Sequence, residues 1–246
     1  MSDAIEARKP EAFDMEVKLL TLPRQVASVL VRRIATDDIA DGLSEQHVML
    51  EFGVSRSVAR EALRILATLD MIEIAQGRRV ALRPAAEWDY LSPLLIDWLP
   101  QDHVRGLLLE GQMSRLLIEP ALAAAAARRM SDADLDHLGA LVAAMAESLD
   151  DPDVYLQLDL DFHTAICRAA GNRILDRFMY SSRWWQTASR RISNRTPHSL
   201  PNATEHHRAI YDALRARDPK RAEDEMRRHL TENAAFGLID ISAPAG

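Results

Sequence analysis

Residues 52–66 read FGVSRSVAREALRIL, and this stretch says more about the fold than any other part of the chain. It predicts a tight turn at Gly53 followed by a helix on which Arg56 and Arg60 lie one turn apart. An amphipathic segment, residues 44–52, precedes it. Two short helices separated by a tight turn form a helix-turn-helix, whose second helix enters the major groove of DNA. The sequence therefore predicts a DNA-binding protein.

Serines mark the expected start of both helices. Ser44 and Ser55 stand where a hydroxyl can accept a hydrogen bond from the first-turn backbone. Arg56 and Arg60 follow closely, at the end of the helix that usually meets base edges. Arginine binds guanine edges and phosphates alike, so the sequence leaves open which of the two each side chain contacts.

The elements around this motif complete a winged domain. Residues 1–17 are polar without a clear period and predict a loose tail, whereas apolar residues from Leu22 to Ile34 recur at helical spacing. Asp41-Gly42 predicts a turn. Two strand-like pieces, Ile72–Ala75 and Val80–Leu82, flank a basic Gln-Gly-Arg-Arg tip and predict a hairpin that could lie along DNA.

In this order of elements, residues 20–84 resemble the winged helix-turn-helix of the GntR family of bacterial transcription regulators. The strings Val54-Ser55-Arg56 and Val58–Leu63 carry the resemblance. The family usually has arginine where this chain has Gln46, and a second wing glycine where it has Arg79, so we expect a different operator sequence or affinity. The resemblance implies a DNA-binding domain over residues 18–84, with contacts from Ser44, Gln46, Ser55, Arg56, Ser57, Arg60, Gly77 and Arg78.

Composition limits the class of protein. The 246 residues are 48% hydrophobic and include only 9 glycines, which favours one large or two ordinary helical domains. A single cysteine, Cys167, the absence of a signal-peptide pattern and the absence of a long apolar run predict a cytoplasmic protein that spans no membrane. The net charge is −7, but residues 54–84 hold six arginines against three acidic groups. A basic DNA-binding domain joined to an acidic second domain accounts for the negative net charge and for the local excess of arginine.

The remainder of the chain predicts a linker and a helical bundle. Residues 85–104 contain Pro93 and Pro100, and their apolar residues predict a short docking segment with Trp88, Leu91, Leu95 and Trp98 as anchors. Residues 105–240 predict six helices with short connections, hence an antiparallel bundle. Pro120 is expected to kink the first, and the fourth is expected from Arg173 to about Arg195.

Four polar residues of the bundle suggest a metal site. Asp159 and His163 lie four apart among apolar residues, so they share one inward face of a helix. His207 and His229 lie on two later helices, each beside apolar residues. One carboxylate and three imidazoles suit Zn²⁺, with Ni²⁺ or Mn²⁺ as alternatives. His206 is a rival for the place of His207.

The string Asp-Leu-Asp-Phe-His at residues 159–163, Ala-Ala-Gly-Asn at 169–172 and the Glu-His-His-Arg-Ala-Ile string before a final histidine resemble the FCD effector domain of the FadR subfamily, over about residues 105–238. The resemblance implies that Asp159, His163, His207 and His229 hold the metal. It also implies that Arg115 faces an effector, where it can clamp a carboxylate. Asn172 either contacts the effector or, as we favour, caps the preceding helix.

These interpretations converge on a regulator. The resemblance implies a homodimer that binds double-stranded operator DNA, and we expect a repressor released by a small carboxylate bound beside the metal. The linker resembles that of relatives that sense sugar acids, so a hexonate or uronate is the first expectation, with lactate and dicarboxylic acids also open. The alternative function is a metal-dependent enzyme that uses the Asp/His₃ centre. The helix-turn-helix favours the regulator over this enzyme.

Overall fold

The computed structural model describes residues 21–39, 43–74, 80–193 and 199–235, and the chain divides after Asp89 into two compact units. The predicted tail, the Asp41-Gly42 turn and the hairpin tip with Gly77 and Arg78 lie outside the described residues. The domain limits at residues 84 and 104 stay predictions.

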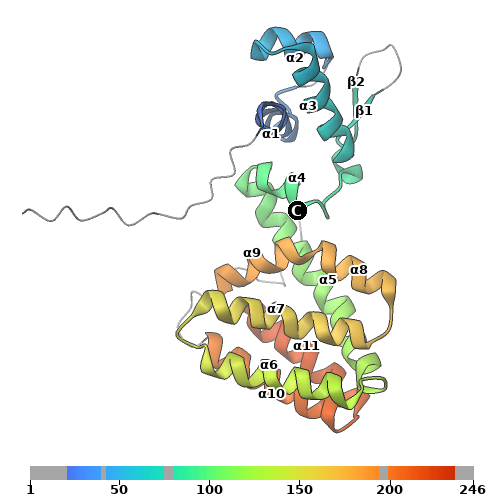
Figure 1. The fold of residues 1–246 in the computed structure, drawn as a ribbon, viewed down its shortest axis with the longest axis vertical. Coiled ribbons are helices and arrows are strands. Elements are labelled where there is room, and N and C mark those ends of the chain that lie inside the picture. Colours follow the sequence, from blue (N-terminus) through green and yellow to red (C-terminus); the bar gives the residue numbers. More distant parts are fainter. Residues whose placement is uncertain (1–20, 40–42, 75–79, 194–198, 236–246) are drawn as a thin grey trace, which may run out of the picture. The chain divides into compact units, whose positions relative to one another are not determined.

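The first unit has the predicted winged helix-turn-helix order (Figure 1). Its elements are α1 (Leu22–Ala35), α2 (Glu45–Phe52), α3 (Arg56–Thr68), β1 (Ile72–Ile74), β2 (Val80–Leu82) and the 3-10 turn η1 (Ala85–Glu87). The two strands pair antiparallel, with Ile72 opposite Leu82. The turn between α2 and α3 depends on Gly53, whose φ of 62° is a left-handed conformation that glycine adopts without steric cost.

The serine caps of this unit are confirmed. Ser44 Oγ accepts a hydrogen bond from the backbone N–H of His47 at 3.1 Å, and Ser55 Oγ accepts one from Val58 at 3.4 Å. Each cap satisfies one backbone donor that the first turn of a helix leaves without a partner. Both helices therefore begin where the local sequence predicts.

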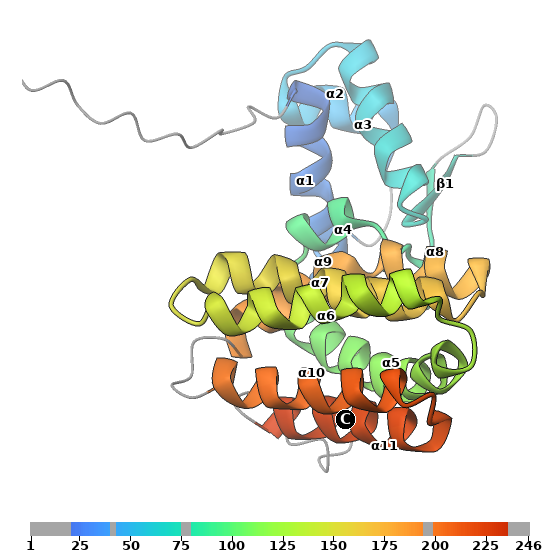
Figure 2. The same ribbon diagram turned by 60° about the horizontal axis from the view of Figure 1, so that its bottom comes forward.

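The described part of the second unit consists of helices. Helix α6 lies beside α7, and α10 lies beside α11 (Figure 2). The bounds are α4 (Pro93–Trp98), α5 (Gln101–Ala127), α6 (Asp132–Glu147), α7 (Pro152–Ala169), α8 (Arg173–Ser181), α9 (Arg183–Ser193), α10 (Ser199–Arg215) and α11 (Pro219–Ala235). The long α5 packs against α7, α9 and α11. It passes through Pro120 without ending there.

A continuous apolar core positions the helices of this unit. Phe162 of α7, Ile210 of α10 and Met226 of α11 are fully buried in one cluster with residues of α5 and α6. Removing this much apolar surface from water is the main favourable contribution to folding. The polar site described below lies on the same inward faces of α7, α10 and α11 as this core.

One predicted helix is wrong. The segment expected to run unbroken from Arg173 to about Arg195 is two helices, because α8 ends at Ser181 and α9 begins at Arg183. Ser182 between them is fully buried, and its hydroxyl donates to the carbonyl of Met179 at 2.8 Å. Gln186 of α9 donates to the same carbonyl at 3.3 Å. These side chains satisfy backbone that a continuous helix would satisfy itself. Within the described residues, this segment therefore contributes two helices to the bundle where one was expected.

Two smaller expectations also need correction. Asn172 does not cap the helix before it: its side chain accepts hydrogen bonds from the N–H groups of Ile174 and Leu175 and so caps the start of α8. Leu91 is 37% exposed and is no anchor, whereas Trp88, Leu95 and Trp98 are buried, as expected of the linker segment. Within the described residues, no helix combines the length and apolar character needed to cross a membrane.

Candidate metal and effector site

Three helices of the second unit bring four polar side chains together. Asp159 and His163 come from α7, His207 from α10 and His229 from α11. Each offers one ligand atom, and these atoms lie within 4.8 Å of one another. All four residues are at most 5% exposed. The structure therefore gathers the four residues that the sequence analysis singled out.

Local sequence explains why α7 contributes two of them. Asp159, Phe162, His163 and Ile166 follow one another at intervals of three or four residues and are all buried, so they form a single face of the helix. The next acidic residue, Asp161, is displaced around the helix and points to its exposed side, where it pairs with Arg183 at 3.3 Å. Helical spacing alone thus separates the inward carboxylate from the outward one.

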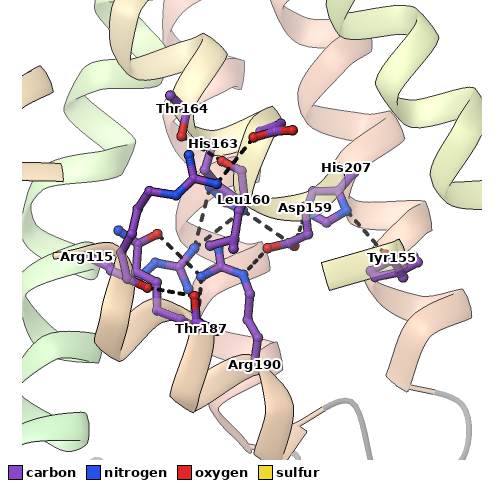
Figure 3. A network of polar contacts seen from close by, with 12 residues as sticks. Arg115, Tyr155, Asp159, Leu160, His163, Thr164, Thr187, Arg190 and His207 are labelled. Atoms are coloured by element: carbon purple, nitrogen blue, oxygen red, sulfur yellow. Dashed lines mark hydrogen bonds and ion pairs between the residues drawn. The ribbon is translucent and has the colours of Figure 1, made fainter. Parts of the chain in front are cut away.

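The Nε2 atoms of the histidines point at a common centre. His207 Nε2 lies 3.1 Å from Asp159 Oδ1, and His163 Nε2 lies 3.8 Å from the same oxygen. His229 Nε2 lies 3.2 Å from His163 Nε2. Figure 3 shows the carboxylate of Asp159 directed between the ring of His207 and the guanidinium of Arg190.

Two of these imidazole rings are held at their other nitrogen. His163 Nδ1 lies 2.6 Å from Glu119 Oε2, in the geometry of a charge-assisted hydrogen bond. His207 Nδ1 lies 3.5 Å from the hydroxyl of Tyr155, which in turn contacts Thr204 Oγ1 at 3.0 Å. Partners of this kind set the tautomer and the ring orientation of metal-ligating histidines.

Burial keeps the imidazoles neutral. Removal from water lowers the pKa of His163 and lowers the pKa values of His207 and His229 well below the usual value. The positive charges of Arg115 and Arg190 act in the same direction for His207 and His229. A neutral imidazole has a lone pair to donate, so all three rings are in the protonation state that a metal requires.

Two buried arginines flank the cluster, and the sequence analysis found only one of them. Arg115 of α5 donates from Nε to Glu119 Oε1 at 2.5 Å. Arg190 of α9 is ion-paired through Nε with Asp159 Oδ2. The signal for Arg190 was its spacing of four residues from Gln186, which places both on one buried face of α9. The direction of that face depends on the break before α9 and on its packing against α5 and α7, which the sequence analysis does not predict.

The residues present fit a divalent metal ion. One carboxylate and three neutral imidazoles are the donor set that Zn²⁺, Ni²⁺ and Mn²⁺ accept. His207 Nε2 is fully buried and lies near Asp159 Oδ1, but among the described residues it makes no hydrogen bond of good geometry, which is costly for a polar atom unless something else satisfies it. A metal bound by the four side chains would do so.

His206, the rival of His207, faces elsewhere. Its Nε2 lies 3.0 Å from Glu232 Oε2, and the residue is absent from the group of converging ligand atoms. Because successive helical residues are about 100° apart around the axis, only one of two adjacent histidines can point at the centre. In this structure that residue is His207.

Among the described residues, most of the predicted DNA contacts of the first unit are exposed, and Ser44 is half-buried. Arg60 donates to Glu45 Oε1 at 2.8 Å, and Arg56 lies 3.9 Å from the same carboxylate. The hydroxyls of Ser55 and Ser57 are 2.9 Å apart beside them. Gln46 is exposed on α2, two residues after Ser44. These side chains lie at the N-terminal ends of α2 and α3, and their role as DNA contacts stays a prediction.

Comparison with known proteins identifies both units. Residues 22–82 match the model of bacterial regulatory proteins of the gntR family, and residues 112–232 match the FCD domain. The galactonate operon transcriptional repressor of Escherichia coli K12 is 27% identical over 73% of this chain and 80% of its own length. The transcriptional repressor NanR of Citrobacter rodentium is 30% identical over 89% of this chain and 85% of its own.

A solved structure supports the fold. Lar, which controls the expression of the Listeria monocytogenes agr system, superposes with a TM-score of 0.57 over 87% of this chain and 95% of its own, at 19% identity. At that level of identity the likeness concerns the fold alone.

The fold and the matched domains define a DNA-binding transcription regulator rather than an enzyme. The chain belongs to the GntR family of bacterial regulatory proteins, in the group whose second domain is an FCD domain. The metal-dependent enzyme weighed in the sequence analysis is therefore not supported, and the Asp/His₃ group is a site within a regulator.

Proposed function

We propose that the protein is a homodimeric repressor that acts in the cytoplasm and leaves its operator when a small carboxylate binds beside a divalent metal ion. The observation that carries the proposal is the convergence of Asp159, His163, His207 and His229 within one buried cluster that has Arg115 at its edge. Two copies of α3 would read the two halves of a short palindrome. Zn²⁺ is the metal we favour, with Ni²⁺ or Mn²⁺ as alternatives.

The proposed effector class is a sugar acid, a hexonate or uronate. The galactonate operon repressor is among the relatives, and its name concerns a hexonate. A sugar acid has a carboxylate and adjacent hydroxyl oxygens, which an arginine and a metal can bind together. Lactate and dicarboxylic acids share part of that chemistry, so an effector screen must include them.

The residues of the site divide this task. The bound metal would supply a Lewis acid for one oxygen of the effector, and the four ligands would hold it. Arg115 would bind a second oxygen through its guanidinium, and because the residue is only 5% exposed, its charge is little screened by water. Asn172 has its side-chain oxygen engaged as the cap of α8, so it would meet an effector through its amide nitrogen.

Release of DNA requires a difference in affinity. The effector must bind the conformation that does not hold DNA more tightly than the conformation that does, since equal affinity shifts nothing. Each factor of ten in that preference corresponds to about 1.4 kcal/mol. We therefore expect effector and operator to weaken each other's binding by the same factor.

The test combines metal content with operator binding. Zinc-loaded wild type, the double variant His207→Ala with His229→Ala, and the control His206→Ala are titrated with hexonates, uronates, lactate and dicarboxylates in the presence of labelled operator. We expect the double variant to lose the metal and the effector response while it still binds DNA, and the control to keep both. Stoichiometric zinc in the double variant, by elemental analysis, would refute the assigned ligands.

A further inference from the structure

Glu119 occupies a special position between the two halves of the proposed site. It lies on α5, is 3% exposed, and each of its carboxylate oxygens has a different partner. Oε1 accepts a hydrogen bond from Arg115 Nε at 2.5 Å, and Oε2 lies 2.6 Å from His163 Nδ1. Glu119 therefore touches both the arginine proposed to bind the effector and a histidine proposed to bind the metal.

Direct contact between the same two residues is weaker. Arg115 Nη2 lies 3.4 Å from His163 Nε2 and 3.5 Å from Nδ1, which is longer than either contact of Glu119 (Figure 3). A cation next to an imidazole repels a metal ion bound to that ring. The favourable link between the two runs through the Glu119 carboxylate.

We propose that Glu119 is a positioning residue that couples anion binding at Arg115 to metal binding at His163. The proposal rests on the proposed function, because it takes the metal and the effector to occupy this site. It extends that function by assigning the route along which the two ligands reinforce each other.

The physical reason is that Arg115 and His163 share one negative charge. A carboxylate that accepts from Nδ1 of a metal-bound imidazole makes the opposite nitrogen a stronger donor to the metal. As long as Arg115 holds Oε1, part of that charge is compensated by the guanidinium. When an anion neutralises Arg115, Glu119 acts more strongly on His163, and the metal is held more tightly. By linkage, the metal then tightens anion binding by the same factor.

The charge state of Glu119 agrees with this role. Burial alone would raise the pKa of its carboxyl, but the positive charge of Arg115 and the hydrogen bonds from His163 and Arg115 outweigh burial and hold that pKa below its usual value. Glu119 offers no ligand atom to the converging group, so its influence on the metal is indirect. Asp159, which is paired with Arg190 in a similar way, is itself one of the four ligands and cannot play the same intermediary part.

A double-mutant cycle on zinc affinity tests the proposal without an identified effector. Zn²⁺ is titrated against a chromogenic chelator in wild type, Arg115→Met, Glu119→Gln and the double variant. We expect E119Q to weaken zinc binding by about 10- to 100-fold. Removing the charge of Arg115 imitates its neutralisation, and we expect R115M to tighten zinc binding by about fivefold or more in the wild-type background.

The proposal is tested by comparing the effect of R115M on zinc affinity with and without the E119Q substitution. If Glu119 transmits the effect, the gain from R115M shrinks to less than half in the E119Q background, and what persists is through-space repulsion between Arg115 and the metal. An equal gain in both backgrounds overturns the proposal. Asp161→Asn on the exposed side of α7 is the control, and it should leave the affinity and the R115M gain unchanged.

A second variant keeps the test decisive if E119Q does not fold. Glu119→Asp retains the charge but is one methylene shorter, so it cannot hold both partners, and an undiminished R115M gain in that background again overturns the coupling. A wild type that binds no Zn²⁺, Ni²⁺ or Mn²⁺ would instead refute the proposed function. Failure of the coupling is thereby distinguished from failure of the metal site.

Discussion

The close approach of α9 to α5 leads to a quantitative prediction. A Cβ added at Gly111 of α5 would lie 2.7 Å from two ring carbons of Trp185 on α9. Trp185 is 4% exposed, so its ring has little room to move away. Overpacking of this kind costs about 1–3 kcal/mol. Replacing a helical glycine by alanine returns about 0.5–1 kcal/mol, so Gly111→Ala should lower the free energy of unfolding by up to about 2.5 kcal/mol.

The same helix supplies a matched control. A Cβ at Gly106 would meet nothing within 4 Å, so Gly106→Ala should raise the free energy of unfolding by about 0.5–1 kcal/mol. The glycine-to-alanine gain is common to both variants, so they should differ by the overpacking cost of about 1–3 kcal/mol, or about 2–12 °C in melting temperature for a domain of this size. A Cβ at Gly139 would lie 2.8 Å from the Tyr211 hydroxyl, the movable end of a side chain, so Gly139→Ala should fall between them.

Urea and thermal unfolding followed by tryptophan fluorescence measure these differences, since Trp184 and Trp185 both lie on α9. Zinc affinity adds a second readout. Arg190, which contacts Asp159, lies on the same helix, so displacing α9 should weaken metal binding in Gly111→Ala but not in Gly106→Ala. A Gly111→Ala protein as stable as the Gly106→Ala protein would refute the packing argument.

Three further outcomes are expected. Arg60→Ala should weaken operator binding by about 5- to 150-fold, equivalent to about 1–3 kcal/mol, and Arg64→Ala by less; equal effects in fluorescence anisotropy would count against the assigned contact. Arg115→Met should reduce the effector response more than operator affinity, which an operator titration with and without effector separates. Burial lowers the pKa values of His207 and His229, so the unfolded state binds more protons below pH 6.5. The metal-free protein should therefore lose about 3 kcal/mol of stability between pH 7.5 and 5.5, and urea midpoints that do not change with pH would contradict this.

Much of the fold followed from local pattern. The helical period of apolar residues and the capping serines Ser44 and Ser55 defined the helix-turn-helix, and the structure begins α2 and α3 where those caps predict. The same reasoning placed Asp159 and His163 on one inward face of α7. Periodicity and capping act within a few residues of chain, so a single sequence contains them fully.

Periodicity and capping do not predict the contacts between helices. The break at Ser182 depends on side-chain bonds to the Met179 carbonyl that compete with a continuous helix, and helical propensity does not reveal them. Arg190 became part of the site only because α9 starts anew after the break and packs against α5 and α7. The sequence shows that Glu119 lies four residues after Arg115, but it does not predict that Glu119 also contacts His163.

The sequence by itself determined which residue types are available and which face of each helix they occupy. Only the tertiary structure decided that His207, and not its neighbour His206, turns toward His163 and His229, because that choice depends on the rotation of α10 against α7 and α11. Rotation and register between helices follow from the packing of their side chains over the whole core. That packing is a property of many distant residues at once, and for that reason no short pattern along the chain records it.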